Sequence, residues 1–222
     1  MKNIGYEIDF LPVGEDEKSG DAIAFRFGNL LGPREEQTLV VIDGGFKESG
    51  EQLVEHIKKY YQTDHVNVVI STHPDGDHAS GLSVVLEKMT VDYLLMHKPW
   101  EHAEDIKSFF KDKRLTVSGL EEKIEKSLQH ASDLEDLATK KGIEIIEPFQ
   151  GVTGFNYIMH VLGPSKEYYQ GLLSQFRQTP VPIKALDFLA PVQKLAKETI
   201  KWVNDAFHLD LLDDDEDTTS AE

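Results

Sequence analysis

The chain has 222 residues and a formal net charge of −17, with 40% hydrophobic and 28% charged residues. This composition is typical of a globular protein that can bury a core, and it offers no uncharged apolar run long enough for a transmembrane helix. The chain contains no cysteine, which excludes disulfides and thiolate metal ligands. Its first residues lack the apolar segment of a signal peptide, so we expect a cytoplasmic protein that does not bind membranes. The negative charge disfavours tight nonspecific binding to nucleic acid.

Alternating apolar residues predict three strands at the start of the chain, over residues 4–13, 21–27 and 38–42. The polar turn between the first two predicts a hairpin with a long loop. The third strand ends at Asp43, which is followed by two glycines. Apolar residues at helical spacing then predict an amphipathic helix over 48–61.

A β-branched run at 66–70 predicts a buried strand, and a Pro/Gly-containing turn follows it. Four side chains of metal-ligating types fall within six residues of this turn: His73, Asp75, Asp77 and His78. In an extended or turning backbone the first two can share one face, whereas the last two diverge and can reach a second point. The pattern predicts two pairs of ligands for two metal ions, an arrangement that activates water and clamps both oxygens of a displacement. A solvated polar loop is the alternative interpretation.

A helix over 79–88 and a strand over 91–96 continue the alternation and predict an α/β fold. The loop after this strand lies at the same kind of strand end as the metal-ligating turn. Its residues Lys98, Trp100 and His102, together with His97, are therefore candidate substrate contacts, with the lysine on a phosphate and the tryptophan stacked on a base or sugar. Alternatively, the tryptophan packs in the core.

The middle of the chain is predicted to be helical, followed by further strands. The sequence indicates a short helix over 103–110 and a long helical region over 115–141, which Gly142 ends as a C-cap. Two strands over 143–146 and 157–162 and another helix over 166–176 follow. His160 lies in the second of these strands. It is a possible extra ligand, although a strand histidine is more often packed.

The chain divides into three predicted segments. Residues 1–178 form the principal domain. Residues 179–212 contain a proline-punctuated stretch and then an amphipathic helix, and residues 213–222 form an acidic tail that resembles disordered segments.

The pattern His-x-Asp-x-Asp-His at His73–His78 resembles the signature of the metallo-β-lactamase superfamily, in which His-x-His-x-Asp-His is commonest. Aspartate at the second histidine position, here Asp75, resembles the hydrolase domain of the ComEC/Rec2 DNA-uptake proteins. The same group is similar at four shorter stretches: Phe-Leu-Pro-Val-Gly at 10–14, Gly-Asp-Ala-Ile at 20–23, Val-Ile-Asp-Gly-Gly at 41–45 and Val-Leu-Gly-Pro at 161–164. The acidic turn after residue 14 is longer than is usual in that group.

This resemblance implies a four-layer αβ/βα sandwich of two similar halves, and it implies that Asp43 orients the metal loop by hydrogen bonds. The second half of that fold brings a further strand run and a bridging aspartate, and no such run follows Leu162. We therefore expect a metallo-β-lactamase-like fold that is truncated or shortened after its first half, with extra C-terminal helices. Such a half sandwich exposes an apolar sheet face unless a partner, a second copy or those helices cover it.

Together these features predict a metal-dependent hydrolase of the phosphodiesterase or nuclease type, with a dinuclear site and a metal-bound hydroxide. The ions are expected to be zinc or manganese, and Asp75 in place of histidine favours manganese. Asp77 would also orient the attacking water. The alternative is a non-catalytic or truncated subunit that acts through a protein partner or as a homo-oligomer. A third possibility, hydrolysis of a thioester or lactam, is disfavoured by the resemblance of the opening motifs.

Overall fold

The computed structural model describes residues 4–14, 20–110, 112–154 and 159–173. The predicted segment 179–212 and the acidic tail 213–222 lie outside the described residues. Among the helices described, none has the length and apolar character needed to cross a membrane.

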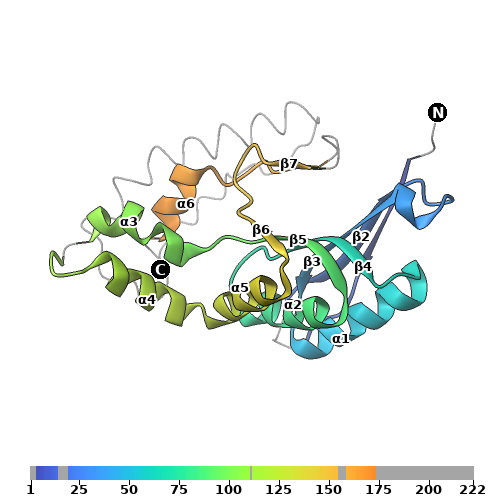
Figure 1. Ribbon diagram of the computed structural model, residues 1–222, viewed down its shortest axis with the longest axis horizontal. Coiled ribbons are helices and arrows are strands. Elements are labelled where there is room, and N and C mark those ends of the chain that lie inside the picture. The colour runs from blue at the N-terminus through green and yellow to red at the C-terminus, as the bar shows by residue number, and fades with distance from the viewer. Residues whose placement is uncertain (1–3, 15–19, 111, 155–158, 174–222) are drawn as a thin grey trace, which may run out of the picture.

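In the described part of the chain, the main sheet has six strands, in the spatial order β1-β2-β3-β4-β5-β6 (Figure 1). Their bounds are β1 Gly5–Phe10, β2 Ala22–Gly28, β3 Gln37–Gly44, β4 His65–Ile70, β5 Thr90–Leu95 and β6 Glu144–Ile146. The first three strands are antiparallel, whereas β3 to β6 are parallel. The predicted α/β class is confirmed, and the strands predicted up to residue 96 and at 143–146 are all present.

Three helices cover one face of this sheet: α1 Lys47–His56, α2 Gly76–Lys88 and α5 Gln129–Lys141 (Figure 1). Alternate residues of the strands point into that layer, as Leu39 and Val41 of β3 do, and both are almost fully buried. They pack with apolar residues of the helices such as Leu53 and Leu82. The core between sheet and helices therefore follows from the two periodicities read in the sequence.

The described residues also form several other helical segments and a second strand pair. They are η1 Arg34–Glu36, the π-helical turn η2 Ile57–Tyr61, η3 Pro99–His102, α3 Ala103–Ile106, η4 Lys107–Phe109, α4 Val117–Ser127, the strand pair β7 Thr153–Gly154 and β8 Met159–His160, and α6 Lys166–Leu173. The predicted helix over 103–110 is thus α3 followed by η4. Of the predicted strand over 157–162, the described part contains only β8.

Two helix boundaries differ from the prediction. The helical region 115–141 is two helices, because Leu128 (φ −121°, ψ 40°) leaves the helical conformation. The break lets α4 pack on η3 and α3 while α5 packs on α2 and β6, which one straight helix could not do. Gly142 does end α5, with φ 70°. The helix after the ligand turn begins at Gly76 instead of residue 79, because the Asp75 carbonyl already accepts a hydrogen bond from the Ala79 amide (2.9 Å).

The opposite face of the sheet is also apolar. Phe27, Val40, Val68 and Leu95 form a second buried cluster there. The same face continues onto the edge strand β1, where Tyr6, Ile8 and Phe10 are 76%, 45% and 75% exposed. The described residues thus leave an apolar strip at one edge of the sheet, which agrees with the exposed face expected from the sequence.

Three glycines let α1, α2 and the end of β3 approach one another closely. A Cβ atom on Gly81 of α2 would lie 1.9 Å from the carbonyl oxygen of Gly44, and one on Gly50 would lie 2.3 Å from the carbonyl oxygen of Gly81. The Gly81 amide also donates to the Gly45 carbonyl (2.8 Å). Because α2 carries part of the ligand turn, this backbone contact fixes the turn against the end of β3.

We predict that Gly81→Ala destabilises the protein by about 1–3 kcal/mol, the usual cost of overpacking. This loss opposes helix propensity, which by itself favours alanine over glycine. The measurement is urea unfolding, with Glu87→Ala on the exposed side of α2 as the control that should stay near the wild-type value. A Gly81→Ala variant as stable as the wild type would contradict the close contact.

Candidate metal centre

The polar residues of interest follow neighbouring parallel strands. Asp43 lies at the end of β3, His73 follows β4, His97 follows β5 and Glu147 follows β6. Since the carboxyl ends of parallel strands lie along one edge of a sheet, the fold gathers these side chains there. Open α/β sheets place their ligand sites at this edge.

Asp43 is the most buried of the polar residues, with 1% of its surface exposed. It has a left-handed backbone conformation (φ 53°), which aspartate tolerates better than most residues. Its Oδ1 accepts a hydrogen bond from the Thr72 amide (2.8 Å), and its Oδ2 accepts from the Thr72 hydroxyl (2.5 Å) and contacts His78 Nδ1 (3.0 Å). One carboxylate therefore joins β3, the turn after β4 and the first turn of α2.

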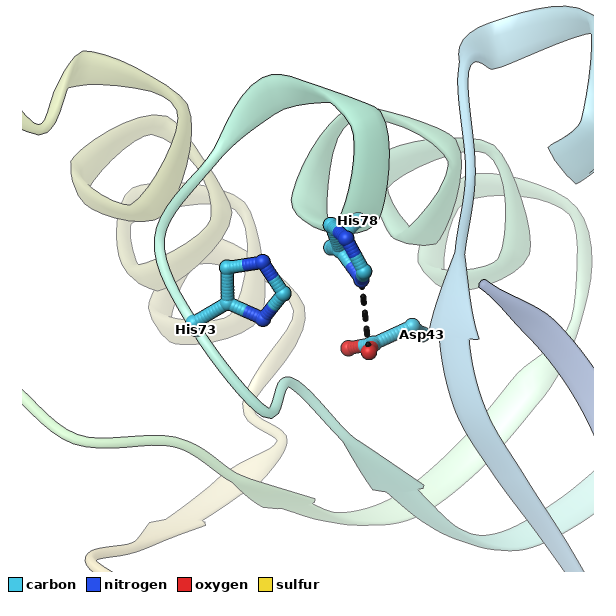
Figure 2. A group of neighbouring side chains, drawn as sticks. All are labelled: Asp43, His73 and His78. Carbon is cyan, nitrogen blue, oxygen red and sulfur yellow. Dashed lines mark hydrogen bonds and ion pairs between the residues drawn. The ribbon is translucent and has the colours of Figure 1, made fainter. Parts of the chain in front are cut away.

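Asp43, His73 and His78 lie together, and one ligand atom of each lies within 4.8 Å of the others (Figure 2). The two imidazole rings are tilted, with centroids 3.6 Å apart. Because a carboxylate only accepts hydrogen bonds, His78 Nδ1 donates its proton to Asp43 Oδ2. The lone pair on His78 Nε2 is then left to bind a metal ion. A carboxylate that orients a histidine in this way is common beside metal ions.

Asp77 and Asp75 lie at the start of α2. Asp77 Oδ2 is 3.9 Å from His78 Nε2. Two tetrahedral zinc ligands at about 2.0–2.2 Å lie about 3.3–3.6 Å apart, so these two atoms are slightly farther apart than ligands of one zinc ion. Asp75 and Asp77 also line an open polar pocket with Ser127 to His130. Among the described residues, the three-residue group contains neither aspartate, so their ligand roles stay predictions.

Asp21 is a neighbour of the site that the sequence analysis did not select. Its Oδ2 lies 3.7 Å from His78 Nδ1. The preceding residue, Gly20, approaches the turn so closely that a Cβ atom there would lie 2.1 Å from the Asp77 carbonyl oxygen. In the sequence, the glycine of this Gly-Asp-Ala step is the signal for a close backbone approach.

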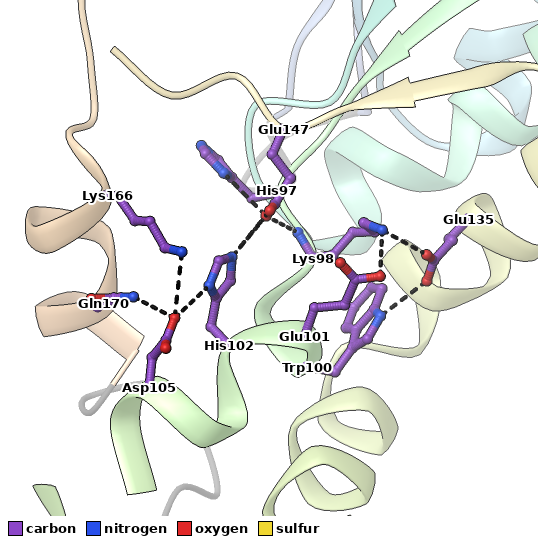
Figure 3. A network of polar contacts seen from close by, with 10 residues as sticks. All are labelled: His97, Lys98, Trp100, Glu101, His102, Asp105, Glu135, Glu147, Lys166 and Gln170. Atoms are coloured by element: carbon purple, nitrogen blue, oxygen red, sulfur yellow. Dashed lines mark hydrogen bonds and ion pairs between the residues drawn. The ribbon is translucent and has the colours of Figure 1, made fainter. Parts of the chain in front are cut away.

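Two of the predicted substrate contacts, Trp100 and Lys98, bind carboxylates of the protein itself (Figure 3). Trp100 is 5% exposed, belongs to the core cluster and donates its indole N–H to Glu135 (2.9 Å), so its ring faces are not free to stack on a base. Lys98 pairs with Glu101 and with Glu135 (3.4 Å). Burial lowers the pKa of Lys98, but these carboxylates outweigh it and raise the pKa above 10.5. The core interpretation of Trp100 fits the structure.

His102, the third predicted contact, forms a buried ion pair (Figure 3). Its Nε2 lies 3.0 Å from Glu147 Oε1, and its Nδ1 lies 3.4 Å from Asp105 Oδ2. The hydrogen bond to Glu147 raises the pKa of His102 above 6.5, against the effect of burial. Burial would raise the pKa of Glu147, but His102, His97 and the Lys98 amide lower it far below 4.5.

His97 and His160 both line a cavity that also touches His73. His160 lies on β8, and its ligand role stays a prediction, because it is not in the three-residue group found among the described residues. His97 belongs to the loop predicted to contact the substrate, and it is one of the first residues after the parallel strand β5.

The His102–Glu147 pair predicts a pH-dependent stability difference between the wild type and Glu147→Gln. A raised histidine pKa contributes stability below about 6.5 and loses it as the pH rises through the folded value. A lowered glutamate pKa contributes stability above about 4.5 and loses it only as the pH falls through the folded value. The difference in unfolding free energy should therefore be largest near pH 5–6 and smaller at pH 9.

Urea unfolding at several pH values measures this difference. Glu121→Gln on the exposed face of α4 is the control and should give no trend with pH. A difference for Glu147→Gln that grows towards pH 9 would contradict the charged pair.

The family model of the metallo-beta-lactamase superfamily matches residues 30–158. A comparison with curated proteins found no match. The matched stretch covers more than half of the chain and includes Asp43, the ligand turn and Glu147. The superfamily is largely hydrolytic, and the His/Asp group provides a possible metal site, so the match and the geometry together indicate a metal-dependent hydrolase. From the family match and the fold, this chain belongs to the metallo-beta-lactamase superfamily.

Proposed function

We propose that this chain is a metal-dependent phosphodiesterase with a dinuclear site at the end of β3 and β4. The observation that carries the proposal is the donor set. His73 and His78 present imidazole nitrogens beside the Asp43 carboxylate, and Asp77 approaches the free nitrogen of His78. Imidazole with carboxylate suits zinc and manganese. These residues therefore fit the divalent ions that the superfamily typically binds.

In this proposal His73, Asp75, Asp77 and His78 hold two ions. The bound ions supply Lewis-acid activation of water and stabilise the charge that develops on the phosphate oxygens. Asp43 keeps the His78 ring in the orientation that leaves Nε2 available, and Asp77 orients the attacking water. Asp75 adds a hard oxygen donor, which favours manganese relative to an all-histidine set.

Two features support a phosphodiester as the substrate. The ligand turn and the opening motifs resemble the ComEC/Rec2-like hydrolase group. In addition, α2 has 13 residues and begins at Gly76 beside the site, so its N-terminal dipole favours an anionic group there. A lactam or thioester gains less from that dipole, because its reacting carbonyl is uncharged before attack.

We predict that the purified chain binds about two divalent ions. Metal content by mass spectrometry should fall in His73→Ala and in His78→Ala, because each variant removes one nitrogen donor. The matched control is His65→Ala, since His65 lies away from the site and pairs with Asp92 (2.8 Å). Equal metal content in all four proteins would show that the ligand turn is not the metal site.

Asp43→Asn should keep the fold and weaken metal affinity by about 10–100-fold, the usual cost of losing a carboxylate that orients a histidine ligand. Competition with a fluorescent chelator measures this affinity. An affinity loss as complete as that of His78→Ala, together with a lost ion, would instead assign Asp43 as a direct ligand.

For the reaction itself, the manganese- or zinc-loaded protein should hydrolyse bis(p-nitrophenyl) phosphate. Asp77→Asn should lower kcat by about 100-fold or more, the range for removal of a group that handles the attacking water. Asp92→Asn is the control, because Asp92 lies at the His65 pair. Hydrolysis of a chromogenic β-lactam without hydrolysis of the phosphodiester would refute the phosphodiesterase assignment.

A second candidate function is a non-catalytic subunit that acts through a protein partner or as a homo-oligomer. The exposed apolar strip of Tyr6, Ile8 and Phe10 favours it. Sedimentation at several concentrations tests for self-association. A chain that binds no metal and forms a stable oligomer would favour this candidate over the enzyme.

A further inference from the structure

A cavity of about 520 Å³ adjoins the candidate metal centre. His73 and Thr72 of the ligand turn line one part of it, and His97, Met159 and Tyr169 line others. Its volume lies within the range of pockets that enclose a small organic ligand. It is too small to hold more than a fragment of a nucleic-acid strand.

The cavity wall is mostly apolar, with residues such as Leu95, Met96, Val161 and Leu172. Among the described residues that line it, none is Lys, Arg, Asp or Glu. The nearby Lys98 does not line it and is already paired with two carboxylates. The wall therefore suits an uncharged group, and an anionic group on the same ligand would remain at the His73 end.

Two of the residues that line this cavity, His97 and Tyr169, nevertheless carry buried polar atoms. In the described part of the chain, both ring nitrogens of His97 and the hydroxyl of Tyr169 are buried and have no hydrogen-bond partner. Glu147 Oε1 lies 3.7 Å from His97 Nδ1, within reach of an ion pair but beyond hydrogen-bond distance. An unpaired buried donor or acceptor destabilises the folded state, so such groups are usually paired or reserved for a ligand.

These groups are also held rigidly. The His97 ring stacks on Tyr169 with centroids 4.2 Å apart and an interplanar angle of 24°, and it contacts Phe149 at 4.7 Å. Burial raises the pKa of Tyr169, and the nearby Glu147 charge adds to this effect, so its hydroxyl keeps its proton. Tyr169 is therefore a fixed donor, and the two ring nitrogens of His97 add further polar atoms.

We infer that this cavity binds the heterocyclic base of a small nucleotide phosphodiester whose phosphate lies at the metal centre. This inference rests on the proposed function. A base is uncharged and carries donors and acceptors on its edge, which match Tyr169 and His97, while the apolar wall accepts its faces. The chain is thereby assigned to mononucleotide-sized substrates, in keeping with a net charge of −17 that disfavours long nucleic acids.

The test is binding of the uncharged nucleosides adenosine, guanosine, cytidine and uridine, which carry no phosphate and so report on the cavity alone. At least one should bind to the metal-loaded protein in calorimetry. Tyr169→Phe, which removes only the hydroxyl, should weaken that binding by about tenfold, the equivalent of one hydrogen bond. The control is Tyr168→Phe, because Tyr168 neighbours Tyr169 on α6 but is not among the cavity-lining residues.

A second measurement uses the wild-type protein, and variants are needed only to assign the histidine signals. In wild-type protein labelled at histidine, the nucleoside should shift the ring signals of His97 and leave those of His65 unchanged. Absence of nucleoside binding at millimolar concentration, or binding that leaves both His97 and the Tyr169→Phe affinity unaltered, overturns the inference.

The two proposals can fail separately. Hydrolysis of bis(p-nitrophenyl) phosphate without nucleoside binding would retain the phosphodiesterase and refute the base site. Nucleoside binding at His97 without hydrolysis of any phosphodiester would retain the base site as a binding pocket and refute the enzyme.

Discussion

The contacts of one buried carboxylate organise this site. Asp43 accepts hydrogen bonds from the Thr72 amide and hydroxyl and contacts His78 Nδ1, so it joins the end of β3 to two consecutive parts of the ligand turn. The Asp43 backbone adopts a left-handed conformation in making these contacts. Strain of this kind persists where the surroundings over-determine it, and such residues cluster at functional sites.

The glycine contacts explain how the carboxylate can reach its partners. Gly81 of α2 lies against the Gly44 carbonyl directly after Asp43, and any larger side chain would push the helix away from the strand. The first turn of α2 is thereby held close enough for His78 to meet Asp43. The close glycine contact and the buried contact between Asp43 and His78 thus depend on each other. Neither of them alone would position the ligand turn.

The local features of this chain could be read from the sequence, and the long-range ones could not. Strand periodicity identified β3 and β4, and the close spacing of His73, Asp75, Asp77 and His78 identified the ligand turn, because both signals lie within a few residues. The break at Leu128 escaped detection, because it depends on which partners α4 and α5 pack against. Trp100 could have faced solvent or core, and its burial depends on packing in the core cluster and on a hydrogen bond to Glu135, far along the chain. The burial of both ring nitrogens of His97 could not be predicted for the same reason, since it depends on the folded surroundings.

The charge of the chain bears on what such a site can use. A net charge of −17 creates a repulsive field for polyanions, but at physiological salt this field is screened beyond about 8 Å. A long nucleic acid must lie along the acidic surface and meets that repulsion at many phosphates. A short phosphodiester meets it once, at a point where a helix N-terminus and divalent ions favour negative charge. The uncharged remainder of such a ligand gains from the apolar cavity beside His73. The negative charge of the chain and the apolar cavity therefore both favour small substrates that have one anionic group and one uncharged group.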